Sequence, residues 1–269
     1  MNLRDELIQA LVVAKISSPR LETDIILKNS APQYPEISEQ EISKAREMLK
    51  RRINHEPLDK IIGKKEFYKS AFKVNQDVLS PRPDTEILVE KALNLMPKDM
   101  LYKILDLGTG SGCILLSVLK ECPLALGVGV DISKKALNVA KENALELGVA
   151  NRIEFINKSW SDIDFGNVKF DIIVSNPPYI PTEEIATLET EVKSYDPLIA
   201  LDGGKDGLDC YKDIASLAAK WLKAGGYILL EVGYNQAECV KNIFENKGFK
   251  FIEFAKDLSG IKRCVILKK

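Results

Sequence analysis

The sequence predicts an α/β domain with a mostly parallel sheet, preceded by a small all-helical domain. Three observations support this prediction. From residue 104 onward, short apolar runs alternate with helical patterns. The last two runs are too close together for a helical crossover, so they should pair as an antiparallel hairpin. Residues 1–65 show helical periodicity. We therefore expect two domains joined by a short linker.

The composition is typical of a globular protein. The 269 residues include 38 basic and 39 acidic side chains, and 45% are hydrophobic, which argues against disordered and fibrous classes. Five cysteines without a C-x-x-C pair argue against a disulfide framework and favour a reducing, cytoplasmic location. No apolar run approaches the ~18 residues of a membrane span. One histidine, His55, leaves little for histidine-based metal chemistry, so we expect no metal.

Residues 1–65 are expected to form the N-terminal helical domain. Ser18 and Pro19 provide a cap and a first-turn proline for its second helix. Ser38 opens a capping-box signature before the third helix. A short fourth helix should end at Gly63, because glycine readily adopts the left-handed conformation that ends helices.

The boundary between the two domains is expected near residue 65. The basic run at residues 50–52 lies near the end of a helix, where we expect it to complement the helix dipole and stay solvated. Residues 66–82 place β-type residues around polar turn residues, which predicts a β-hairpin linker. Residues 83–269 then form the second domain.

Apolar runs in the second domain predict one Rossmann-like, seven-stranded sheet with a C-terminal antiparallel hairpin. Helical patterns separate the first five strands, as parallel pairing requires. This arrangement resembles the class I S-adenosylmethionine-dependent methyltransferases, a likeness at the level of the fold. The predicted strands are Ile104–Leu107, Leu126–Val130, Ile153–Ile156, Phe170–Val174, Tyr227–Glu231, Phe249–Ala255 and Arg263–Leu267.

The loop after the first strand carries three glycines at alternate positions. Such glycines let the backbone turn sharply and approach a ligand without Cβ atoms in the way. Asp131 lies nineteen residues after Gly112 and ends the second strand, where a carboxylate can accept hydrogen bonds from two ribose hydroxyls. These features predict a nucleoside cofactor site, and the alternative is a tight turn without a ligand. The cofactor-binding candidates here are Gly108, Thr109, Gly110, Ser111, Gly112 and Asp131.

Two nucleoside cofactors compete for this site. NAD also uses a glycine-rich loop, but the spacing here is G-x-G-x-G rather than G-x-G-x-x-G. Asp106 would repel a pyrophosphate, whereas it suits the positively charged α-amino group of S-adenosylmethionine. Trp160 follows the third strand and is placed to stack on an adenine, with a plain core position as the alternative. The sequence therefore favours S-adenosylmethionine.

The residues Asn176, Pro177, Pro178 and Tyr179 directly follow the fourth strand. Two prolines fix φ and provide no N–H, so this turn is rigid and rich in carbonyl acceptors. An amide or aromatic NH₂ is a poor nucleophile because its lone pair is delocalised, and it must be aligned to attack a methyl group. The Asn176 side-chain oxygen and the Pro177 carbonyl can each accept one of its hydrogens. Pro178 and Tyr179 would pack on its flat face. The alternative is a strand-ending turn without chemistry.

With these motifs, the chain resembles the release-factor glutamine-N5 methyltransferases over nearly its whole length. It departs from their frequent pattern at Ser159 and Lys69, where relatives often carry Asp and Gly. The segments that carry the resemblance are residues 56–63 with 66–68, 80–86, 106–112, 176–179, and 195–197 with 200–208.

The resemblance implies a methyl transfer from S-adenosylmethionine to the Gln side chain in the Gly-Gly-Gln motif of peptide chain release factors. We expect a single in-line reaction without a metal or a covalent enzyme intermediate, with Asn176 and Pro177 as catalytic residues and water as the eventual proton acceptor. The resemblance also implies that the N-terminal helical domain helps to hold the release factor. The implied cofactor positions are Gly108–Gly112, Asp131, Trp160 and Asn176, and the implied glutamine-binding positions are Asn176–Tyr179.

Two other function classes remain open. An enzyme that methylates an exocyclic amine of a nucleic-acid base would use similar chemistry. However, residues 1–70 carry 13 basic and 11 acidic side chains, and the remainder is net acidic, so we expect no nucleic-acid substrate. A non-catalytic S-adenosylmethionine-binding protein would require a damaged site, whereas these motifs are intact. The acidic connection at residues 180–208 is expected to close over the substrate or to be a solvated connection.

Overall fold

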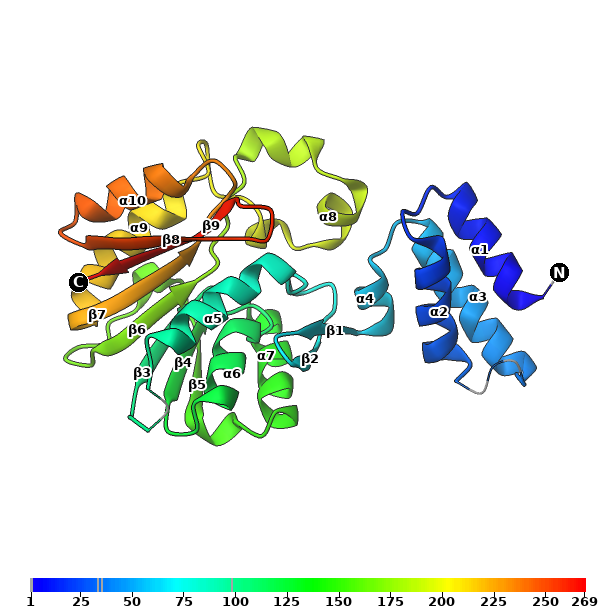
Figure 1. The fold of residues 1–269 in the computed structure, drawn as a ribbon, viewed down its shortest axis with the longest axis horizontal. Helices are drawn as coiled ribbons and strands as arrows, with labels where there is room; N and C mark the ends of the chain where they lie inside the picture. The colour runs from blue at the N-terminus through cyan, green and yellow to red at the C-terminus, as the bar shows by residue number, and fades with distance from the viewer. Residues whose placement is uncertain (1, 33, 35, 98) are drawn as a thin grey trace. The chain divides into compact units, whose positions relative to one another are not determined.

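The computed structural model describes residues 2–32, 34, 36–97 and 99–269. The chain divides into two compact units (Figure 1). The helical unit consists of Met1–Lys64 with Glu189–Tyr195, and the sheet unit consists of Lys65–Leu188 with Asp196–Lys269. The short segment 189–195, which lies inside the second domain by sequence, therefore belongs to the helical unit.

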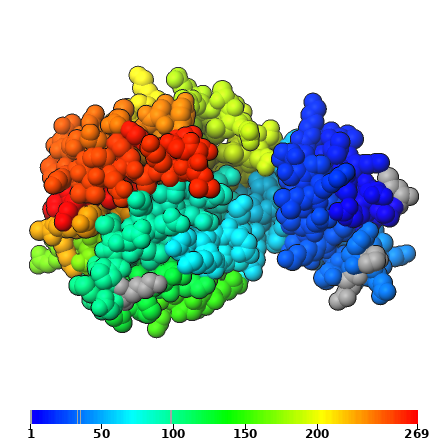
Figure 2. All heavy atoms as spheres, in the orientation of Figure 1, coloured from blue at the N-terminus to red at the C-terminus, as the bar shows by residue number. Residues whose placement is uncertain are grey.

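The helical unit packs amphipathic helices around its own apolar core, which includes the fully buried Leu7, Leu11 and Ile26. The helices α1, α2 and α3 lie in the blue part of Figure 2. The predicted capping box is present, because the Ser38 side chain accepts from a backbone N–H in the first turn of α3. Gly63 ends α4 with φ of 80°, as predicted. The helices of this unit are α1 (Leu3–Val13), α2 (Pro19–Ser30), α3 (Glu39–Ile53), α4 (Leu58–Ile62) and α8 (Thr190–Tyr195).

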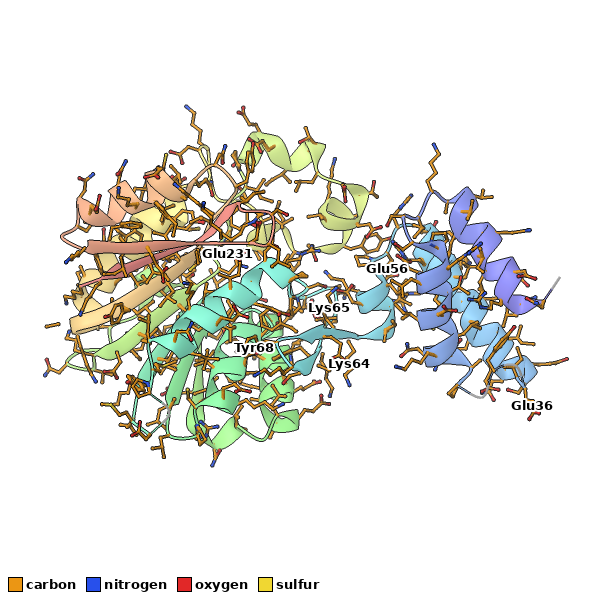
Figure 3. The ribbon with its side chains drawn as sticks, viewed as in Figure 1. Glu36, Glu56, Lys64, Lys65, Tyr68 and Glu231 are labelled. Carbon is orange, nitrogen blue, oxygen red and sulfur yellow. The ribbon has the colours of Figure 1, made fainter. Side chains whose placement is uncertain are left out.

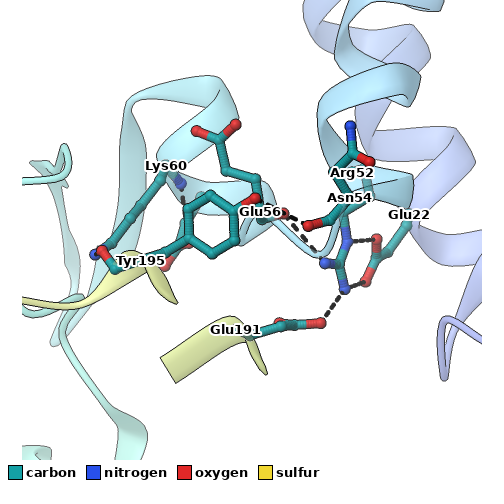
Figure 4. Close-up of polar contacts among 8 residues, drawn as sticks. Glu22, Arg52, Asn54, Glu56, Lys60, Glu191 and Tyr195 are labelled. Atoms are coloured by element: carbon teal, nitrogen blue, oxygen red, sulfur yellow. Dashed lines mark hydrogen bonds and ion pairs between the residues drawn. The ribbon is translucent and has the colours of Figure 1, made fainter. Parts of the chain in front are cut away.

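Arg52 connects three parts of the helical unit (Figure 4). Its guanidinium group lies 2.5 Å from the Glu22 carboxylate and 2.7 Å from that of Glu191. Arg52 is 4% exposed, so the expectation that the basic run at 50–52 stays solvated is wrong for this residue. The helical periodicity of α3 can place Arg52 on one face of the helix. It cannot predict an ion pair with Glu191, which is distant in the sequence.

Tyr195 secures the end of the same segment. Its hydroxyl donates to the Asn54 carbonyl at 2.9 Å, and the Lys60 ammonium donates to the Tyr195 carbonyl (Figure 4). Hydrogen bonds from both ends of one residue fix the segment more firmly than a single contact would. The acidic connection after the Asn176 turn is thus anchored in part to the helices.

The strands β1 (Lys64–Phe67) and β2 (Ser70–Lys73) form a hairpin, which begins two residues before the range of 66–82 expected for the linker and ends well inside it. Its two turn residues, Tyr68 and Lys69, have φ of 40° and 59°. A two-residue turn of this kind matches the twist of the strands but favours glycine, so Tyr68 and Lys69 adopt a backbone conformation that side chains disfavour. The rings of Phe67 and Phe72 pack edge to face, with centroids 5.9 Å apart, in the core of the sheet unit.

Seven strands form one sheet in the part of the chain that the structure describes, in the order β5-β4-β3-β6-β7-β9-β8. The first five of these are parallel, and β9 pairs antiparallel with both β7 and β8. The predicted class I methyltransferase fold, including its C-terminal hairpin, is confirmed. The strands are β3 (Lys103–Leu107), β4 (Leu126–Asp131), β5 (Ile153–Asn157), β6 (Phe170–Ser175), β7 (Leu222–Glu231), β8 (Lys250–Lys256) and β9 (Lys262–Lys268).

Helices cover both faces of this sheet (Figure 1). One apolar core lies under α5 (Glu86–Asn94), α6 (Cys113–Glu121) and α7 (Lys134–Glu146), and a second lies under α9 (Asp209–Trp221) and α10 (Ala237–Glu245). Each fully buried aliphatic side chain in these layers contributes about 1.5–3 kcal/mol. The 3₁₀ turns are η1 (Pro83–Thr85), η2 (Ala150–Arg152), η3 (Trp160–Asp162), η4 (Thr182–Thr187) and η5 (Leu198–Ala200).

Among the residues that the structure describes, no helix has the length and hydrophobicity needed to cross a membrane.

Candidate active site

A pocket of about 350 Å³ opens at the carboxyl edge of the sheet. The loops after β3, β4 and β6 meet there, because the carboxyl ends of parallel strands lie at one edge. Most of the residues predicted from the sequence line it, whereas Gly112, Pro177 and Tyr179 do not. The predicted residues that line the pocket are Gly108, Thr109, Gly110, Ser111, Asp131, Trp160, Asn176 and Pro178.

The three loop glycines have left-handed backbones, with φ of 74° at Gly108, 55° at Gly110 and 80° at Gly112. A Cβ atom on Gly110 would meet nothing within 4 Å, so this glycine faces open space. A Cβ atom on Gly112 would lie 2.8 Å from the Leu116 side chain. Gly110 therefore keeps room for a ligand, while Gly112 permits close packing of α6.

Asp131 closes this loop with both carboxylate oxygens. Its Oδ2 accepts from the Gly110 N–H at 2.9 Å, and its Oδ1 accepts from the Ser133 N–H at 2.8 Å. Burial raises the pKa of Asp131, while these two hydrogen bonds lower it. Each carboxylate oxygen retains a second lone pair for a ligand hydroxyl.

Asp106 is fully buried beneath the same loop. Its Oδ2 accepts from the Thr109 hydroxyl at 2.7 Å, and its Oδ1 has no hydrogen-bond partner among the described residues. Burial raises the pKa of Asp106 to about 7. A buried carboxyl group with a free oxygen beside a glycine loop is suited to a cationic ligand, because a positive charge would stabilise its ionised form.

Trp160 begins η3 and forms part of the pocket wall. A Cβ atom on Gly108 would lie 3.6 Å from Cζ3 of its ring, so the indole packs over the glycine loop. The ring also contacts the apolar core under α9. Trp160 therefore has one surface toward the pocket and one toward the core.

Contacts from a later segment secure the Asn176–Tyr179 turn. The Gln236 side chain donates to the Tyr179 carbonyl at 2.9 Å and to the Gly207 carbonyl at 3.2 Å. A Cβ atom on Gly203 would lie 2.7 Å from the Tyr179 Cα atom. Gly203 is thus needed for the close approach of this segment to the turn.

The phenol of Tyr179 is held in its neutral form. Burial raises its pKa to about 12, and the charge of Glu231 adds to this effect. A neutral phenol provides a flat apolar face and a hydroxyl donor. Tyr179 therefore has no role as a base at neutral pH.

Two residues left unassigned by the sequence also line the pocket. Arg82 donates to the Asp196 carboxylate at 2.8 Å, and Thr85 accepts from the Asn176 side-chain amide at 3.4 Å. Thr85 is 2% exposed. Sequence reasoning also missed Glu231, a buried carboxyl group that ends β7, because nothing in an apolar strand marks its last residue as a neighbour of Asn176.

No group of three or more His, Cys, Asp or Glu side chains that could hold a metal is found among the described residues. All five cysteines of the chain are free.

A family model and a solved structure of a known protein both support this fold. A family model described as a methyltransferase domain matches residues 98–259. A solved methyltransferase from Pyrococcus furiosus matches with a TM-score of 0.54 at 15% identity, over 74% of this chain and 88% of that chain. This likeness supports the fold.

Similarity in sequence is much higher to one group of enzymes. The release factor glutamine methyltransferase of Caulobacter vibrioides is 42% identical over 96% of this chain and 88% of its own length. The enzyme of the same name from Agrobacterium fabrum is 40% identical over 98% of this chain and 91% of its own length. The chain therefore belongs to the release factor glutamine methyltransferase family.

Proposed function

We propose that the chain transfers a methyl group from S-adenosylmethionine to the side-chain amide nitrogen of glutamine in the Gly-Gly-Gln motif of peptide chain release factors. The observation that carries this proposal is that Asn176 and Pro178 line the same pocket as the glycine loop and Asp131. The names of the relatives identify release factors as the substrate class. We place the reaction in the cytoplasm, a reducing compartment that suits five free cysteines.

The residues of the pocket fit S-adenosylmethionine. Asp131 has free lone pairs for ribose hydroxyls, Trp160 offers an aromatic surface for adenine, and Gly110 leaves open space. Asp106 does not line the pocket but lies buried beneath the glycine loop, where its unpartnered oxygen is an acceptor suited to the positive charge of the amino group. When bound, this cofactor supplies an electrophilic methyl group on a positively charged sulfur.

Asn176 and Pro177 would activate the glutamine. The Asn176 side-chain oxygen and the Pro177 carbonyl each accept one hydrogen of the substrate NH₂, which draws electron density onto the nitrogen and favours its pyramidal transition state. Pro177 does not line the pocket itself, but it stands between Asn176 and Pro178, which do. Pro178 and Tyr179 hold the flat amide so that the nitrogen points at the methyl group. The surplus proton leaves to water.

The helical unit would recognise the body of the release factor. It has its own core and is joined to the sheet unit not only near residue 65 but also on both sides of the segment 189–195. That segment follows the Asn176 turn in the chain by little more than ten residues. We propose that the helices and this segment together form the recognition domain.

Incubation of the purified chain with methyl-labelled S-adenosylmethionine tests the proposal. The parallel substrates are an unmethylated release factor, its Gln-to-Ala variant in the Gly-Gly-Gln motif, and total RNA and DNA. We expect label on the first substrate alone. Label on nucleic acid alone would contradict the substrate assignment while leaving the methyltransferase fold in place.

A further inference from the structure

Glu231 is a buried carboxyl group beside the Asn176 turn. It ends β7, whose neighbour β6 ends at Ser175, directly before Asn176, and Ser175 pairs with Leu230 in register. Figure 3 labels Glu231 within the sheet unit. Glu231 is 5% exposed, and its Oε2 has no hydrogen-bond partner within the described part of the chain. Because a buried carboxyl group is costly, its presence at this position needs an explanation.

Asn176 and Glu231 each follow directly after a residue of the pair Ser175 and Leu230, so they lie side by side where β6 and β7 end. The Asn176 amide and the Thr85 hydroxyl, which both belong to pocket-lining residues, lower the pKa of the Glu231 carboxyl group. The Asn176 Nδ2 atom also donates to the Thr85 Oγ1 at 3.4 Å. An asparagine amide donates through nitrogen and accepts through oxygen, whereas an ionised carboxylate can only accept. Ionised Glu231 can therefore accept only from the amide nitrogen of Asn176, which would leave the Asn176 oxygen available to a substrate.

The charged groups around Glu231 balance one another only in part. Arg263 of β9 favours its ionised form, but this guanidinium is shared with Asp84 at 3.1 Å and Asp257 at 2.8 Å. Burial and Asp84 raise the pKa of Glu231, whereas Thr85, Arg263 and Asn176 lower it, and together these effects place it at about 7. The other titratable groups that interact electrostatically with Glu231 are Tyr179, Tyr211, Cys113 and Cys264.

We propose that Glu231 is a positioning residue that fixes the side-chain amide of Asn176 with its oxygen toward the substrate glutamine, and that it does so when ionised. This inference rests on the proposed function for the identity of the substrate. Protonated Glu231 carries an O–H donor, which can hydrogen bond to the Asn176 oxygen and withdraw it from the substrate. Methyl transfer should therefore become slower as the pH falls through the neutral range.

The central test compares wild type with Glu231→Gln, which replaces the carboxylate by a group that both donates and accepts. We expect kcat to fall about 100-fold, with a nearly unchanged KM for the release factor and an unchanged Kd for S-adenosylmethionine by calorimetry. The wild-type kcat should rise from about pH 6 to about pH 8, and the variant should lose this dependence. Glu231→Asp, which keeps the carboxylate, should recover part of the rate and the pH dependence.

A matched control is Glu253→Gln, a partly buried glutamate of β8 that pairs with Lys91 at 2.9 Å. It should keep the wild-type kcat and pH profile. A second measurement needs neither a variant nor turnover. In wild-type protein, the side-chain ¹⁵N–¹H signals of Asn176 should shift with pH as Glu231 titrates.

Two results would overturn the positioning role. One is a Glu231→Gln variant with wild-type kcat and pH profile, and the other is an Asn176 amide signal that does not respond to pH. If the wild type methylates nucleic acid instead of a release factor, the proposed function fails. The pH response of the Asn176 amide would still decide the role of Glu231.

Discussion

The guanidinium group of Arg52 lies 2.7 Å from the carboxylate of Glu191, which is 139 positions further along the chain. This ion pair fixes the segment 189–195 to α3 within the helical unit. Since Glu22 shares the same guanidinium group, one cation balances two acids.

We expect Arg52→Ala to release the segment 189–195. Removing one member of a buried ion pair costs about 3 kcal/mol because the partner is left uncompensated, so backbone amides of the segment should exchange with solvent about 100-fold faster. Hydrogen exchange followed by mass spectrometry measures this directly. Arg46→Ala, which removes an exposed pair with Glu6, should change exchange in this segment little, and equal effects of the two variants would contradict the account.

Asp131→Asn should weaken the binding of S-adenosylmethionine about tenfold or more. Hydrogen bonds to a charged acceptor contribute about 1.5–3 kcal/mol, and the amide replaces one accepting oxygen by a donor next to the Gly110 N–H. Isothermal titration calorimetry gives the affinity. Asp162→Asn, an exposed residue of η3, is the control. An affinity equal to wild type in Asp131→Asn would remove Asp131 from the cofactor site.

The ligand-free sheet unit should become less stable as the pH rises toward neutrality, in part because of Asp106. Its pKa is raised by burial from 3.8 to about 7, so the folded chain keeps a proton that the unfolded chain loses. The stabilising contribution is complete below about pH 4 and is lost as the pH rises through about 7, at no more than about 1.4 kcal/mol per pH unit.

Urea unfolding at several pH values measures whether stability falls as the pH rises. The probe is the fluorescence of Trp160 and Trp221, which both lie in the sheet unit. Asp106→Asn cannot ionise, so its stability should vary less with pH than that of wild type. Asp164→Asn, at an exposed position, should keep the wild-type slope. A wild-type slope in Asp106→Asn would show that the buried carboxyl group does not titrate in this range.

Gly203→Ala should slow methyl transfer about 100-fold while the fold is retained. The new Cβ atom would lie 2.7 Å from the Tyr179 Cα and 2.9 Å from the Pro178 carbonyl oxygen, so the turn must shift. Gly226→Ala is a matched control, because its Cβ would lie 2.9 Å from the backbone oxygen of Asp171. Gly226 lies five residues before Glu231 in β7. This control variant should lower stability without a selective effect on kcat, whereas similar kinetics for both variants would argue against a specific role for Gly203.

The sheet and its loops could be predicted from the sequence because their signals are local. Alternating apolar and helical segments give the strands, and Asp131 and Asn176 are identified by their position directly after strands. Trp160 was also predicted to be near the pocket, and the structure places it on the wall.

The rest depends on contacts between distant segments. Glu231 lies next to Asn176 only because β6 and β7 pair in one particular register. Arg52 is buried because Glu22 and Glu191 reach it from two other segments. Gly203 and Gln236 support the Asn176 turn from 27 and 60 positions later in the chain. Such pairs carry no periodicity or spacing that would identify them in a single sequence.

The central claim is that this chain methylates the side-chain nitrogen of glutamine and that Asn176 enables the transfer. Tandem mass spectrometry of the Gly-Gly-Gln peptide tests it most directly, after a release factor has been incubated with S-adenosylmethionine and either wild type or Asn176→Ala. We predict one added methyl group on the glutamine side chain with wild type and none with the variant. The account would be contradicted if the wild-type protein transferred methyl groups but left this glutamine unmodified. It would also be contradicted if the variant methylated the glutamine as well as wild type does.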